Sequence, residues 1–181
     1  MYVHGYRDDA DSAFNHHALA EQFAKSKVDA LFVVVEAPSG PAQSVMFGDL
    51  DELLSMIDAP EGPVLIIGHS GGNRTLKSWL RSSRVEEVVL LDGFYGESTS
   101  WTKWLTSRPN ASLRIIGQHT LAKSEAWLAT QSQLVRARVT HQPANCGHME
   151  IVTKGEWLPR VITESQHLSP SPRGGEGRGE G

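Results

Sequence analysis

Apolar runs that alternate with segments of helical spacing most strongly limit the fold of this chain. Three such runs, rich in β-branched side chains, cover residues 30–35, 64–67 and 88–91. Runs of this kind are typical of strands buried on both faces, as in parallel sheets. The sequence therefore predicts an α/β fold, a three-layer sandwich with a mostly parallel sheet and helices on both faces.

Most other segments fit the same alternation. Leu50, Leu53, Leu54 and Ile57 recur at helical spacing, with acidic residues in the first turn where the helix dipole favours them. We also expect strands at residues 2–5, 85–92, 113–117 and, as a polar edge strand, 135–140. Further helices are expected at residues 14–24, 76–81, 101–105, 121–134 and 157–162.

The chain length and the C-terminal composition indicate one domain followed by a tail. A chain of 181 residues is long enough for one sheet covered by helices. After Leu168 the only apolar side chains are those of two prolines, among Ser, Gly, Glu and Arg. Such a segment has nothing to bury. We therefore expect a domain at residues 1–165 and a disordered, low-complexity tail at 166–181.

Charge and cysteine content exclude several classes of partner. The 17 basic and 21 acidic residues are interspersed and give a net charge of −4, which argues against a nucleic-acid or anionic-membrane surface.

Cys146 is the single cysteine, which excludes an internal disulfide and fits a reducing compartment. No stretch is long and apolar enough to span a bilayer. A cytoplasmic protein is expected, although Met1 falls at the start of a predicted strand, so the lack of a signal peptide says little.

The most informative motif is Gly68-His69-Ser70-Gly71-Gly72, which joins a predicted strand to a predicted helix. A serine at the apex of such a turn presents its hydroxyl above the sheet edge, and the flanking glycines keep side chains out of crowded backbone. Ser70 is therefore the candidate nucleophile. The alternative is a glycine-rich turn that binds phosphate at a helix N-terminus. The turn lacks the Gly-Lys-Ser/Thr ending of a P-loop, which leaves that alternative little support.

The carboxyl ends of the parallel strands gather further polar residues at the same sheet edge. His4 and Gly5 follow the first strand, Asp92 ends another, and His148 lies after the last strand. A serine hydroxyl needs an imidazole to accept its proton, and the imidazole needs a carboxylate to fix its tautomer. His148 is the predicted base, with His119 as its competitor.

Over residues 1–162 the chain resembles a small, cap-less α/β-hydrolase, with the motif around Ser70, the early His4-Gly5 turn and the order Ser, acid, His. The resemblance implies an oxyanion hole made by the backbone N–H groups of Gly71 and Tyr6. Two features depart from the family. Its first two strands are missing, and no carboxylate follows the strand at 113–117, where the family usually places the acid.

Asp92 is therefore the predicted acid. Glu97 and Glu125 stay open as alternatives, and so does a purely structural role for Asp92 at the end of its strand. The neighbouring His69 is expected to pack beneath the turn.

These residues predict a serine hydrolase that cleaves a carboxylic ester, or else a thioester or amide, through an acyl-enzyme on Ser70. The partner is then a small acyl substrate, and neither metal nor cofactor is expected. Adjacent His16 and His17 would point in different directions on a helix, and Cys146 with His148 lacks further ligands at recognisable spacing. Trp101, Trp104 and Tyr95 are expected either to line an acyl pocket or to belong to the core. Three alternatives stay open: an acyltransferase with the same triad, a non-catalytic binding protein of this fold, and a truncated pseudo-enzyme.

Overall fold

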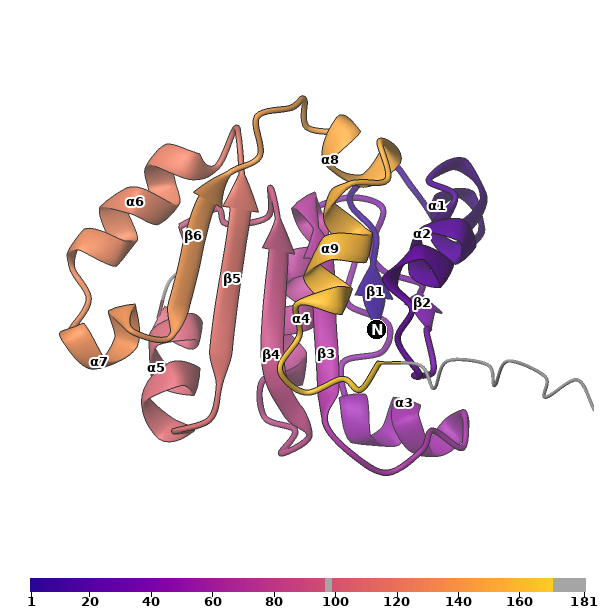
Figure 1. The fold of residues 1–181 in the computed structure, drawn as a ribbon, viewed down its shortest axis with the longest axis horizontal. Helices are drawn as coiled ribbons and strands as arrows, with labels where there is room; N and C mark the ends of the chain where they lie inside the picture. Colours follow the sequence, from indigo (N-terminus) through magenta and orange to yellow (C-terminus); the bar gives the residue numbers. More distant parts are fainter. Residues whose placement is uncertain (97–98, 171–181) are drawn as a thin grey trace, which may run out of the picture.

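The computed structural model describes residues 1–96 and 99–170, and its centre is a parallel six-stranded sheet (Figure 1). The strand order is β2-β1-β3-β4-β5-β6, and each pairing between neighbouring strands is parallel. The strands are β1 (Tyr2–Val3), β2 (Val34–Val35), β3 (Val64–His69), β4 (Val85–Leu91), β5 (Ser112–Gly117) and β6 (Val139–Pro143). The predicted α/β class is confirmed.

Helices cover both faces of the sheet, which gives three layers (Figure 1). Successive residues of the central strands alternate between two apolar clusters: Ile66 contributes to one, and Leu65 and Ile67 contribute to the other. Side chains from α3 (Leu50–Met56), α4 (Asn73–Trp79), α5 (Thr99–Ser107), α6 (Leu121–Ala129) and α7 (Gln133–Arg136) complete the first cluster. Those from α1 (Ala10–His16), α2 (Leu19–Ser26), α8 (Glu150–Thr153) and α9 (Trp157–Thr163) complete the second.

Two predicted helices are each divided in the structure. The helix expected at 14–24 is α1 followed by α2, because the chain turns at His17 and Ala18, and Ala18 has a left-handed backbone with φ 50°. The helix expected at 121–134 is α6 followed by α7, with a new N-cap at Ser132, whose side chain accepts from the Val135 N–H. Local capping and turn geometry therefore override a continuous apolar periodicity.

The prediction of a fully buried strand at residues 30–35 is wrong. Only Val34 and Val35 pair with β1, and they form an edge strand. Leu31 is 52% exposed, and Phe32 stacks on Phe23 of α2 with ring centroids 4.8 Å apart. The apolar run thus divides between packing against a helix, at Phe32, and pairing at the sheet edge, at Val34 and Val35.

The chain reverses its winding direction between β1 and β3. The sheet grows from β1 toward β2 on one side and from β3 through β6 on the other. Ligand sites in open α/β sheets form beyond the carboxyl ends of the strands at such a switch point. Ser70 directly follows β3, so it lies at this position.

The first residues of the predicted tail contact the domain. The Asp29 N–H donates to the Ser169 carbonyl at 3.1 Å, Pro170 forms a β-bridge with Val28, and Leu168 packs against the second apolar cluster. The packed chain thus extends to residue 170, and residues 171–181 lie outside the described residues. Over the described ranges, every helix is too short or too polar to cross a membrane.

Candidate active site

The turn after β3 holds Ser70 in a strained backbone conformation. Strand β3 ends at His69, a 3₁₀ turn, η1 (Ser70–Gly72), follows, and α4 begins at Asn73. Ser70 has φ 49°, a left-handed value that is uncommon for a residue with a side chain. The Asn73 side-chain amide donates to the Ser70 carbonyl at 2.9 Å and secures the turn. This is the sharp strand-to-helix geometry predicted from the motif.

The loop after β1 lies directly against this turn. A Cβ on Gly5 would come within 2.9 Å of the Ser70 Cβ, so only glycine permits this close approach. His4 is buried and fixes the loop: its Nε2 accepts from the Ala37 N–H at 2.9 Å, which leaves Nδ1–H to donate to the Gly5 carbonyl at 2.8 Å. His4 thus supports the loop structurally. The sequence placed His4 at the sheet edge but did not indicate this role.

Asp92 ends β4 with its carboxylate buried and fully hydrogen-bonded. Its Oδ1 accepts from the N–H of Gln118 at 3.0 Å and from the N–H and hydroxyl of Thr120 at 3.0 and 3.1 Å. Its Oδ2 faces Nδ1 of His148 at 2.6 Å and Nδ1 of His119 at 3.1 Å. Burial would raise the pKa of Asp92, but the hydrogen bonds from His148, Thr120 and Gln118 outweigh it and hold this pKa well below its usual value. Asp92 is therefore an ionised, oriented carboxylate.

The loop between β5 and α6 explains how the acid can sit after β4. This loop, residues 118–120, carries no carboxylate, and its backbone and side chains instead bind the carboxylate of Asp92. Asp92 itself has φ 47°, so its backbone, like that of Ser70 at the end of the neighbouring strand, is in the left-handed region. Among the alternative acids, Glu125 is exposed on α6, and Glu97 lies outside the described residues.

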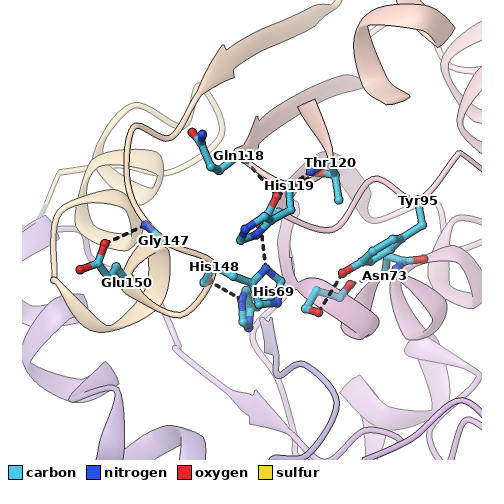
Figure 2. A network of polar contacts seen from close by, with 11 residues as sticks. His69, Asn73, Tyr95, Gln118, His119, Thr120, Gly147, His148 and Glu150 are labelled. Carbon is cyan, nitrogen blue, oxygen red and sulfur yellow. Dashed lines mark hydrogen bonds and ion pairs between the residues drawn. The ribbon is translucent and has the colours of Figure 1, made fainter. Parts of the chain in front are cut away.

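His148 is held at both ends. Its Nδ1 contacts Asp92, and its carbonyl accepts from Nε2–H of His69 at 3.1 Å, with the two rings 4.7 Å apart (Figure 2). Burial first, and the neighbouring His148 second, lower the pKa of His69 to about 4, so His69 is neutral at pH 7. His69 is thus a buried, neutral side chain that lies against the His148 ring and positions the backbone of His148.

The hydroxyl of Ser70 bonds to Tyr95 rather than to His148. The two hydroxyl oxygens lie 3.0 Å apart (Figure 2), and within the described ranges no hydrogen bond joins Ser70 to His148. Tyr95 is 44% exposed, whereas Trp101 and Trp104 belong to the apolar core. The contact of Tyr95 with Ser70 could not be predicted, because no sequence pattern reports which way a loop side chain points.

A groove of about 650 Å³ brings Ser70, His148 and Tyr6 together. Two backbone N–H groups near this groove belong to Tyr6 and Gly71. Among the described residues, neither group donates to a backbone carbonyl in a turn, loop or cap. The Tyr6 ring lies directly against Gly71, and a Cβ on Gly71 would come within 2.4 Å of this ring. The Tyr6 hydroxyl accepts from Arg74 at 3.2 Å, and this fixes the loop from the other side.

Asp92 and the two histidines beside it also provide three donor atoms of the kinds that bind transition metals. Asp92, His119 and His148 each offer one ligand atom, and these atoms lie within 4.8 Å of one another. Carboxylate and imidazole together suit zinc and its neighbours. His119, the competitor to His148 as base, therefore shares the acid with it instead of replacing it.

Comparisons with known proteins add no family: neither a family model, nor a curated protein, nor a solved structure matches this chain significantly.

Proposed function

We propose that the protein is a serine hydrolase that cleaves a carboxylic ester through an acyl-enzyme on Ser70. The observation that carries the proposal is the pair Asp92–His148, with 2.6 Å between Oδ2 and Nδ1, in which His148 lines the same groove as the strained Ser70. A buried carboxylate on Nδ1 leaves Nε2 as the proton acceptor of the imidazole. The resemblance to small α/β-hydrolases supports the same reading.

The reaction follows from these positions. In the proposed reaction, the Ser70 hydroxyl leaves Tyr95 when substrate enters and turns toward Nε2 of His148. Catalytic hydrogen bonds are often absent or long before substrate binds. His148 then takes the proton while the serine oxygen attacks the ester carbonyl, and the Asp92 carboxylate stabilises the imidazolium.

The oxyanion formed by this attack is stabilised by backbone N–H groups. Gly71 follows Ser70 directly and Tyr6 lines the same groove, and a pair of such backbone amides is the usual oxyanion hole of acyl-transfer enzymes. Collapse of the intermediate releases the alcohol, which receives the proton from His148. Water, activated by the same imidazole, then releases the acid and restores Ser70.

One observation favours a different class, a non-catalytic protein of the same fold. The Ser70 hydroxyl is held by Tyr95 at 3.0 Å, and a serine that never leaves this bond performs no chemistry. Hydrolysis of short-chain aryl esters separates the two candidates. A hydrolase releases the phenol at a rate that Ser70→Ala abolishes without a change in fold, because the change removes one buried oxygen. Equal rates for the two proteins would refute the assignment of Ser70.

A further inference from the structure

His119 has no part in the hydrolytic mechanism, yet it shares an oxygen of Asp92 with the proposed base. Its Nδ1 lies 3.1 Å from Oδ2, and Nδ1 of His148 lies 2.6 Å from the same oxygen (Figure 2). The His119 side chain is 65% exposed, so the group is open to solvent on that side. Two imidazole nitrogens and one carboxylate oxygen thus converge at an accessible sheet edge.

The surrounding contacts prepare Asp92 as a ligand. Its Oδ1 accepts three hydrogen bonds from Gln118 and Thr120, which fix the carboxylate plane and direct Oδ2 toward the two imidazoles. Metal-binding carboxylates are typically oriented by such outer contacts. The donor set of two imidazoles and one carboxylate favours divalent transition metals over Mg²⁺ and Ca²⁺, which prefer oxygen ligands.

Two of the three donor distances require only a small adjustment. Ligands at about 2.0–2.1 Å from a tetrahedral zinc lie roughly 3.3 Å apart. The Asp92–His148 pair at 2.6 Å must therefore open slightly, while the Asp92–His119 pair at 3.1 Å already lies near this value. The third distance, between the His119 and His148 nitrogens, is bounded at 4.8 Å. The exposed His119 side chain is the one that can move to shorten it.

We propose that Asp92, His119 and His148 form an inhibitory binding site for a divalent transition metal, with Zn²⁺ the best-matched ion. A metal on Nδ1 of His148 uses the lone pair there, so the single proton of the neutral ring resides on Nε2. An Nε2–H cannot accept the Ser70 proton, and the carboxylate that would stabilise the imidazolium is bound to the metal. Inhibition rests on the proposed function, whereas binding depends only on the three donor atoms.

Metal binding is tested first in Ser70→Ala protein, where hydrolysis plays no part. Calorimetric titration with ZnCl₂ should show one ion per chain, and Co²⁺ should give the visible absorption of a nitrogen- and oxygen-ligated ion. In this background His119→Asn should weaken zinc binding more than about tenfold, because it removes a ligand. His16→Asn, which changes another exposed histidine, should leave the affinity unchanged. Absence of binding, or equal affinity in His119→Asn, overturns the proposal.

Inhibition is then measured on ester hydrolysis by protein freed of metal with a chelator. Zinc should inhibit at concentrations near the calorimetric Kd, and His119→Asn, scaled to its own metal-free rate, should need at least tenfold more. Stimulation by zinc would overturn the inhibitory assignment. Zinc binding to Ser70→Ala, together with no hydrolysis by any form, would leave the metal site standing and refute the hydrolase.

Discussion

Replacement of Asp92 by asparagine tests the link between the buried carboxylate and the base. The amide is isosteric, so its oxygen can keep the bonds from Gln118 and Thr120 that Oδ1 now accepts at 3.0–3.1 Å. Its NH₂ group, however, replaces the oxygen that faces His148 at 2.6 Å. The imidazole must then accept at Nδ1, which places its proton on Nε2, where Ser70 needs a vacant lone pair.

The expected loss in kcat is on the order of 10⁴, the size of the effect when the orienting aspartate of a serine protease becomes asparagine. This corresponds to about 5.5 kcal/mol of transition-state stabilisation. The free energy of unfolding should fall by only about 1–3 kcal/mol, because most of the hydrogen bonds survive. KM should change little, since the Asp92 side chain is buried away from the groove.

Steady-state hydrolysis of an aryl ester, with thermal denaturation of the same samples, provides the measurement. Glu125→Gln and Glu97→Gln are the matched controls, because each neutralises a carboxylate that the sequence left open as the acid. Retention of more than about a tenth of kcat in Asp92→Asn, or a large loss in either control, would refute the role assigned to Asp92.

Three further changes should have measurable effects. Tyr95→Phe frees the Ser70 hydroxyl from a bond worth about 1 kcal/mol, so kcat/KM should rise about fivefold, and a fall would instead make Tyr95 a catalytic donor. His69 is neutral in the fold with a pKa of about 4, against about 6.5 in an unfolded chain. Between pH 4 and 6.5 the His69 imidazole is therefore protonated in the unfolded state but neutral in the folded state. The unfolding free energy should then drop by about 3 kcal/mol as the pH falls from 6.5 to 4. His69→Gln should flatten this decline in a denaturation series. Deletion of residues 171–181, which contain one proline and no other apolar side chain, should leave Tm unchanged, whereas further deletion of 167–170 should lower Tm through lost contacts.

The sequence predicted the central strands and the position of Ser70 because both depend on local patterns. Residues 64–67 and 88–91 are buried on both faces, so their composition alone identifies them. The run at 30–35 has the same composition but lies at the sheet edge, where the helix side chain of Phe23 covers it. Composition alone therefore does not distinguish a central strand from a half-exposed edge segment, because that difference depends on the tertiary structure.

The polar arrangement around Asp92 was only partly predictable. Topology brings Asp92 and the loop of His148 to one edge, and the missing acid after β5 already favoured Asp92. The loop that binds its carboxylate, the second imidazole of His119 and the bond from Tyr95 all depend on side-chain directions in irregular backbone. No periodicity encodes those directions, so they become visible only in the folded structure.

Covalent labelling tests the central claim most directly. A fluorophosphonate reacts with a serine hydroxyl that a neighbouring base activates, and mass spectrometry of the intact and digested chain locates the adduct. The account predicts one adduct per chain on Ser70, no adduct in Ser70→Ala, and strongly slowed labelling in His148→Asn. Failure to label the folded protein, an adduct on another residue, or equal labelling of Ser70→Ala would contradict it.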